Sequence, residues 1–204
     1  MKKTLIVFFA LFVCAGLFAT NYFVGDIGPR GGIIFYSSYI YGKERTLKVF
    51  YEAAPASVDF RAAWGSPDHF LNVPWPSEYD GRSITRQIIE LTEQKAGRSK
   101  LIDYAAFRCY ELRLNGTNDW YMPAQWEMEE MYNALKRSGI LDKDKDKNRQ
   151  YGFKNDIYWC SDEAGEREPY LARVVSMVNG RNTTFRKNSQ FWVRPVRRFI
   201  ETDW

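Results

Sequence analysis

Seven cationic side chains lie in the last part of the chain, between Pro169 and Ile200, and no acidic side chain accompanies them. Arginine and lysine donate charge-assisted hydrogen bonds to carboxylate, sulfate and phosphate groups. Arg181, Arg186 and Lys187 stand beside a predicted hairpin and in the loop after it. We therefore expect these three side chains to be exposed and to form an anion-binding face. The alternative is a basic edge strand whose charges only deter aggregation.

Aromatic side chains offer a second candidate surface. Aromatic residues make up 17% of the sequence, and Trp64 and Trp75 lie in a long irregular stretch, residues 53–81. Long loops in compact domains are commonly functional or packed down by their own side chains. Trp64, which Gly65 follows, is typical of a packed anchor, whereas an exposed tryptophan would suit a sugar-binding face. This loop is therefore the second candidate ligand site.

The sequence lacks the residue sets that catalysis and metal binding require. Its one histidine, His69, has no second histidine nearby for a zinc site, and no Ser-His-Asp set is recognisable in the sequence. Residues 142–148 place acidic side chains at calcium-loop spacing, but Lys147 and Phe153 stand where glycine and glutamate are required. The glycine-rich stretch 24–32 leads into a predicted strand, unlike a phosphate-binding loop. We expect no catalytic residue, no metal and no cofactor, and the net charge of +4 is too small to indicate nucleic acid.

The amino-terminal residues have the features of a secretory signal. Two lysines precede an apolar run from Thr4 to Val13 that is too short to span a membrane. Residues 1–19 are predicted to be a signal peptide that is cleaved after Ala19, with residues 20–204 forming a single domain. A degenerate lipobox that ends at Cys14 is the alternative processing site, and membrane contact is expected only through that lipid anchor.

Export has a consequence for the other two cysteines, Cys109 and Cys160. An oxidising compartment permits a disulfide between them. The other interpretation is that Cys109 is a small buried apolar residue on a helix face. In either case we expect the two thiols to be unreactive at the surface of the folded protein.

Apolar periodicity and turn residues predict a chain of mixed α and β elements. The predicted strands are residues 33–36, 47–52, 158–160, 170–178, 181–186 and 191–199. The predicted helices are residues 83–96, which Ser83 would cap, residues 100–114, and a central helix that Pro123 opens and Gly139 stops. Met128, Met131, Tyr132 and Leu135 form the apolar face of the central helix. Asn179-Gly180 predicts a type I′ turn, and Pro195 predicts an edge position or a bulge in the last strand.

Several of these segments together resemble a bacterial domain family typified by the carboxy-terminal domain of collagen-like adhesins. The segments that carry the resemblance are Gly25–Pro29, Gly31–Tyr36, Tyr51–Pro55, Asn115-Gly116, Asp119–Pro123 with Glu127 or Glu129, Tyr158–Ser161 and Val193–Phe199. The resemblance covers about residues 24–200. Ala124 departs from the pattern, because the family usually has a helix-capping serine after the proline.

The resemblance implies an α+β fold of the C-type-lectin-like kind, with short antiparallel strands, two to three packed helices and long loops. It also implies that Arg194 and Arg197, in the closing motif, are structural and pair with carboxylates. Family members of this kind are mostly secreted or surface-bound proteins that bind ligands. The expected location is the cell surface, the outer membrane or the periplasm.

Three functions remain open from the sequence. The favoured one is a non-catalytic binding module that recognises a glycan, another polyanion, or a host or envelope protein. The second is an enzyme on the related fold of formylglycine-generating enzymes. However, Cys109 and Cys160 do not lie in the cysteine motif of those enzymes. The third is a structural envelope protein without a small ligand.

Overall fold

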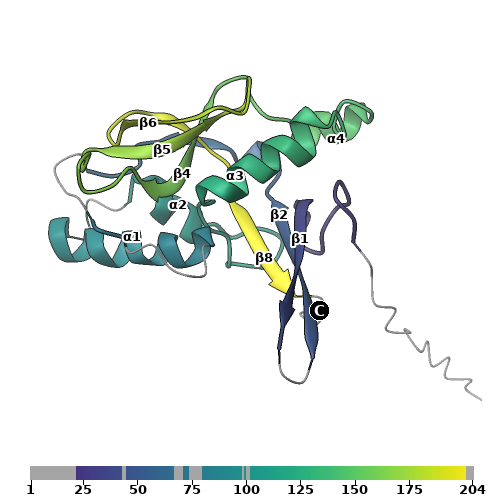
Figure 1. Ribbon diagram of the computed structural model, residues 1–204, viewed down its shortest axis with the longest axis horizontal. Coiled ribbons are helices and arrows are strands. Elements are labelled where there is room, and N and C mark those ends of the chain that lie inside the picture. The colour runs from purple at the N-terminus through teal and green to yellow at the C-terminus, as the bar shows by residue number, and fades with distance from the viewer. Residues whose placement is uncertain are drawn as a thin grey trace, which may run out of the picture.

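The chain forms an α+β fold with two β-sheets and four α-helices in the part that the structure describes. The structure is a computed structural model, and it describes residues 22–42, 45–66, 71–73, 80–97, 99 and 102–200. Figure 1 shows α3 running between the two sheets, with α1 beside the larger one. The predicted signal peptide with Cys14 lies outside the described residues, as do His69 and Trp75.

The smaller sheet has the order β1-β2-β8, and its neighbouring strands are antiparallel. These strands are β1 (Ile33–Tyr41), β2 (Thr46–Ala53) and β8 (Val196–Ile200). The larger sheet has the order β3-β7-β4-β5-β6. Its strands are β3 (Phe60–Ala62), β4 (Ile157–Glu163), β5 (Leu171–Ser176), β6 (Asn182–Arg186) and β7 (Phe191–Val193). The β4–β7 pair is parallel and the others are antiparallel.

The helices connect and cover these sheets. They are α1 (Gly81–Ala96), α2 (Ala105–Tyr110), α3 (Gln125–Met131) and α4 (Lys145–Tyr151). A short 3-10 helix spans Ala56–Val58, and α3 continues as a π-helical segment, Tyr132–Arg137. Helix α3 contacts β1 of the smaller sheet and both β4 and β5 of the larger one. It therefore joins the two sheets.

Pro195 divides the predicted last strand into two strands that belong to different sheets. Proline has no N–H to donate to a sheet ladder, and β7 ends at Val193 while β8 begins at Val196. The carbonyl of Pro195 still accepts a hydrogen bond of 2.9 Å from Ala54 N. Instead of the predicted edge position or bulge, the structure has a break at Pro195, which carries the chain from one sheet to the other.

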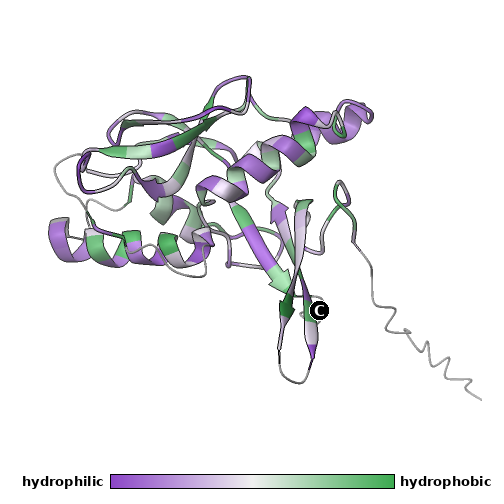
Figure 2. Cartoon of the chain, viewed as in Figure 1, coloured by the Kyte–Doolittle hydropathy of each residue, from purple (hydrophilic) through white to green (hydrophobic). Residues whose placement is uncertain are grey.

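Two predicted segments have a different structure. Of the helix predicted at residues 100–114, the described residues form only α2, and Ile102 is 59% exposed. Residues 142–148, which lie outside every predicted helix, contain the start of α4. The Asp144 side chain caps that helix by accepting hydrogen bonds from the next turn. Figure 2 shows that most of α4 is hydrophilic, so the apolar periodicity that predicts a packed helix is absent there.

The start of α1 and the turn between β5 and β6 lie where the sequence predicts them, but each differs from the prediction in detail. Helix α1 is capped by Asp80 rather than Ser83, because the Asp80 carboxylate accepts a hydrogen bond of 3.0 Å from Ser83 N. β5 and β6 form the predicted hairpin, and Gly180 has a φ of 74°. Asn179 has no positive φ, so the turn is not type I′, which requires positive φ at both central residues.

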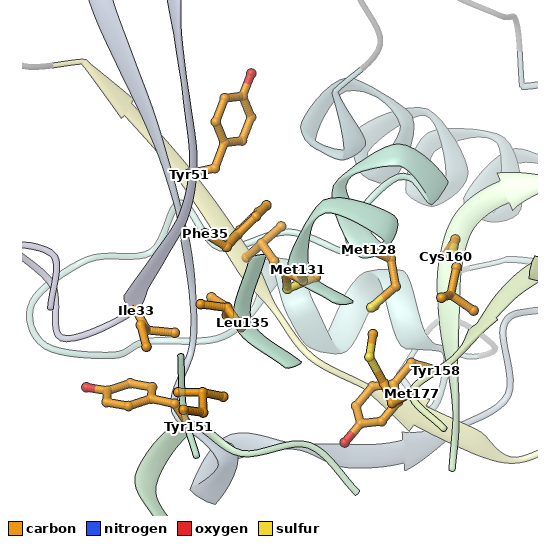
Figure 3. Close-up of a cluster of buried hydrophobic side chains, with 14 of the residues drawn as sticks. Ile33, Phe35, Tyr51, Met128, Met131, Leu135, Tyr151, Tyr158, Cys160 and Met177 are labelled. Atoms are coloured by element: carbon orange, nitrogen blue, oxygen red, sulfur yellow. The ribbon is translucent and has the colours of Figure 1, made fainter. Parts of the chain in front are cut away.

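The core consists of two large apolar clusters on opposite sides of β4. Tyr158 and Cys160 belong to the cluster around α3, whereas Trp159 belongs to the cluster around α1. This alternation is what a β-strand imposes on successive side chains. Figure 3 shows Met128 and Met131 between Phe35 of β1 and Cys160 of β4. The predicted apolar face of the central helix is confirmed, with Met128, Met131 and Leu135 buried.

Cys109 and Cys160 are both free and both buried, so the structure does not contain the disulfide that was the alternative. The physical reason is their placement: Cys109 packs in the α1 cluster and Cys160 in the α3 cluster. Burial raises the pKa of both thiols above the ordinary value. Neither thiol is therefore ionised or accessible in the folded protein.

We expect both thiols to resist alkylation in the native state. Iodoacetamide should modify neither Cys109 nor Cys160 during a short incubation of the folded protein near neutral pH, as read by intact mass. In denaturant both should react, which serves as the control. Rapid labelling of either cysteine in the native protein would contradict the buried placement.

Candidate functional site

Lys187 does not belong to an exposed anion-binding face, because it is buried; the prediction that it is exposed was wrong. The Lys187 side chain is 0% exposed and forms an ion pair with Glu163. Its ammonium lies 4.9 Å from the ring centroid of Trp64. After β6 the chain turns inward, because Lys187 N donates to Tyr170 O and Lys187 O accepts from Trp64 N. Lys187 therefore fastens the end of β6 to the loop after β3.

Three more of the seven cations are occupied by carboxylates. Arg194 Nη2 lies 2.7 Å from Asp59 Oδ2, and both side chains are buried. Arg197 donates to Glu52 Oε1 at 3.0 Å and to Asp119 Oδ1 at 2.6 Å. The structural pairing predicted for Arg194 and Arg197 is confirmed. Arg198 likewise donates to Asp80 Oδ2 at 2.9 Å.

The remaining predicted site residues do not converge. Arg181 and Arg186 are exposed at opposite ends of β6, and the Arg186 guanidinium lies 5.7 Å from the Tyr170 ring centroid. Trp64 is 1% exposed, and its indole donates to Cys160 O at 2.9 Å. The packed-anchor interpretation of Trp64 is confirmed, and its buried ring offers no sugar-binding face.

A groove lies along α1 and was not predicted from the sequence. It consists of two adjoining hollows of about 450 Å³ and about 190 Å³, which share Arg86 and Tyr110 as lining residues. Helix α1 forms one wall of both hollows. Helix α2 forms the other wall of the larger hollow, and residues 118–121 complete the smaller one.

The smaller hollow is lined by two guanidinium groups that have no partner within the described residues. Arg82 and Arg86 stand four residues apart on α1, and neither side chain forms an ion pair or hydrogen bond with those residues. Trp120 also lines the hollow, but it is 1% exposed, and its Nε1, which has no hydrogen-bond partner among the described residues, is itself buried. The two arginines can therefore bind a group that supplies acceptor oxygens.

Three other polar groups of the smaller hollow are already engaged. Thr85 Oγ1 donates to Met122 O at 3.2 Å and accepts from Met122 N at 3.0 Å. The Asp119 carboxylate accepts from Arg197, which also pairs with Glu52, and the Tyr121 hydroxyl donates to Glu127. Because Arg197 partly compensates the charge of Asp119, Arg82 and Arg86 give the smaller hollow a net positive charge.

The larger hollow has the opposite charge at its far end. Ile89 of α1 and Phe107 of α2 supply apolar surface. Glu90 and Glu111 line the same hollow, and both are exposed. The groove is thus cationic where it meets residues 118–121 and acidic further along α1 and α2. The spacing of Arg82, Arg86 and Glu90 is visible in the sequence, but nothing in the sequence shows that α2 and Trp120 lie beside them.

A buried carboxylate holds the two walls of the smaller hollow in register. Glu127 Oε2 accepts hydrogen bonds from Gly81 N at 3.0 Å and Ala124 N at 2.7 Å. Glu127 Oε1 accepts one of 2.7 Å from the Tyr121 hydroxyl. The bond from Ala124 N is the half of a capping box that Glu127 supplies, whereas Ala124 has no side-chain oxygen to supply the other half. The start of α1 and the segment before α3 are therefore tied to one side chain.

Gly81 is required by the closeness of this contact. A Cβ at Gly81 would lie 2.3 Å from Met122 O and 2.5 Å from Ala124 N, which no side chain tolerates. The first residue of α1 thus packs directly against the backbone of the neighbouring segment. This approach fixes the position of Arg82 and Arg86 relative to Trp120.

Burial raises the pKa of Glu127 to about 8, although three hydrogen bonds are donated to its carboxylate. Between the ordinary value of 4.5 and about 8, the folded protein retains a proton that the unfolded chain has lost. The contribution of Glu127 to stability is therefore greatest on the acid side and falls as the pH rises towards 8.

We expect Glu127→Gln to flatten this pH dependence. The glutamine carbonyl can accept from Gly81 N and Ala124 N, and its amide can donate to the Tyr121 oxygen. The wild-type free energy of unfolding should fall relative to that of the variant by on the order of 3 kcal/mol between about pH 5 and pH 8.5. Urea denaturation at several pH values measures it. Glu130→Gln, on the same helix but partly exposed, is the matched control, and parallel curves for wild type and Glu127→Gln would contradict the assignment.

The described residues contain no group of three or more His, Cys, Asp and Glu side chains that could hold a metal ion. Among those same residues, no helix has the length and hydrophobicity needed to cross a membrane. Comparison of the sequence with known protein families gave no match, and comparison with curated proteins gave none either. The function must therefore be argued from the groove itself.

Proposed function

We propose that this protein is an exported, non-catalytic binding domain and that its ligand lies in the groove between α1, α2 and residues 118–121. The groove, whose cationic end has no partner within the described residues, is the observation that carries the proposal. Ligand sites are concave surfaces with apolar walls and a few polar groups that fix orientation. Ile89 and Phe107 provide the apolar surface, and Arg82 and Arg86 provide the donors.

The strongly shifted titratable groups support binding rather than catalysis. Perturbed pKa values often mark catalytic groups when these face a cleft. Here the Glu127 carboxylate is occupied by two backbone N–H groups and the Tyr121 hydroxyl. Cys160 is buried in the α3 cluster. Their pKa shifts are therefore explained by structural burial.

We also propose that the fold is C-type-lectin-like and that the protein is located in the periplasm or at the cell surface. The α+β architecture with short antiparallel strands is compatible with such a fold. The cationic and apolar amino-terminal sequence favours export to the periplasm or the cell surface. A glycan, a polyanion and a host or envelope protein are the ligand classes that such a domain would meet there.

The intact mass of the protein recovered from the cell envelope tests whether it is exported. Intact-mass analysis of envelope-fraction protein should show a chain that lacks the signal sequence. A chain that begins after Ala19 would indicate ordinary cleavage, and a chain with acyl groups on Cys14 would indicate a lipoprotein. A cytoplasmic protein that retains Met1 would rule out export.

The groove is tested by filling it. Ile89→Trp places a large ring in the larger hollow from a half-buried position on α1, and we expect it to abolish binding of ligands found on a glycan and matrix-protein array. The loss should exceed about tenfold in affinity, because the ring excludes the ligand from the apolar wall. Thermal melting checks that the variant is folded.

Arg181→Gln with Arg186→Gln is the matched control, because it removes two exposed cations far along the chain from the groove. Binding that survives Ile89→Trp but is lost in this control would move the site to β6. Binding that neither change affects would exclude both surfaces.

A further inference from the structure

We infer that the groove binds a peptide chain end: a terminal carboxylate at Arg82 and Arg86, and a cationic side chain at Glu90 and Glu111. This inference rests on the proposed function, because it names the ligand class of the same groove. Two features of the groove carry it, namely the two arginines at the narrow end, which have no partner within the described residues, and the opposite charge at the other end.

The donors at the narrow end favour an acceptor group. Arg82 and Arg86 present two guanidinium groups with fixed, forked N–H donors that match a carboxylate. A carboxylate supplies two acceptor oxygens, so it can accept from both guanidinium groups together.

The size of the narrow end also limits what enters it. Its volume is about 190 Å³, much smaller than the 450 Å³ of the adjoining hollow. A terminal carboxylate with one small side chain fits such a space, and the chain then continues past Arg86 and Tyr110, which both hollows share. The larger hollow therefore holds the residues that precede the chain end.

The acidic end of the groove disfavours a polyanion. Glu90 and Glu111 line the larger hollow, opposite in charge to Arg82 and Arg86. A uronic acid polymer repeats its negative charge along its length, so the part beyond Arg86 would meet carboxylates. A peptide can carry a carboxylate at its end and a lysine or arginine a few residues earlier. The charge order of the groove thus favours the peptide.

The distance between the charges sets the spacing in the ligand. With a rise of ~1.5 Å per residue in an α-helix, Glu90 lies ~6 Å along the axis from Arg86 and ~12 Å from Arg82. An extended peptide advances ~3.3 Å per residue. The cationic side chain should therefore stand about two to four residues before the terminal carboxylate.

The test uses fluorescence anisotropy with a labelled peptide of six residues and the mature chain. The probe has a free terminal carboxylate, a lysine three residues before it, and alanine elsewhere. We expect saturable binding that weakens on the order of tenfold or more when the carboxylate is amidated, as loss of charge-assisted hydrogen bonds implies. Replacing the lysine with norleucine should weaken binding less, and added salt should weaken binding of the parent probe.

Variants of the chain assign each end of the probe. Arg82→Gln with Arg86→Gln should remove the difference between free and amidated peptides, whereas Glu90→Gln with Glu111→Gln should remove only the preference for lysine. Arg181→Gln with Arg186→Gln is the charge-matched control and should change nothing.

The outcomes separate this inference from the proposed function. Equal binding of free and amidated peptides, or no binding of the probe, overturns the inference. If array ligands still depend on the groove in that case, the proposed binding function stands with another ligand class. Tighter binding of oligogalacturonate than of the peptide would also overturn the inference in favour of an acidic glycan. If Ile89→Trp has no effect on any ligand, the proposed function fails as well.

Discussion

The hydrogen bonds of one buried carboxylate determine how the parts of this fold meet. Glu127 lies in the first turn of α3 and binds the first N–H of α1, the N–H of Ala124 and the hydroxyl of Tyr121. Tyr121 in turn exchanges backbone hydrogen bonds with Val196 of β8. A helix start, the central helix and an edge of the smaller sheet are therefore fixed by one connected set of bonds. The cost of burying the carboxyl group is the raised pKa, so the fold depends on these donors being in place.

The basic residues near the end of the chain show a second constraint. β7 lies between β3 and β4 inside the larger sheet, and the chain then crosses to the smaller sheet as β8. Arg194 stands at this crossing, fully buried against Asp59. Removing one partner of such a pair leaves an uncompensated buried charge, which costs far more than an exposed pair contributes. Three of the cations that suggest a binding face, Arg194, Arg197 and Arg198, thus form ion pairs that hold this crossing segment in the fold.

Local patterns in the sequence predicted those parts of the fold that local forces determine. The 3.6-residue periodicity predicted the apolar face of α3, and Pro195 predicted an irregularity in the last strand, though not that β7 and β8 belong to different sheets. Partners from distant segments could not be seen in this way. Lys187 is buried because Glu163 and Trp64 surround it, and neither lies near it in sequence. The groove depends similarly on α2 and Trp120 coming to the side of α1.

The same bonds that stabilise the fold give the groove its rigidity. The start of α1 is held through Gly81, and residues 121 and 122 are held through Glu127 and Thr85. Both walls of the narrow end are therefore positioned before a ligand arrives, which lowers the entropy lost on binding. A preorganised site discriminates by where its charges and donors stand rather than by closing around the ligand. The segments that carry Arg82 and Arg86 are held in this way relative to residues 118–121, so a ligand must bring its acceptor group to these two side chains.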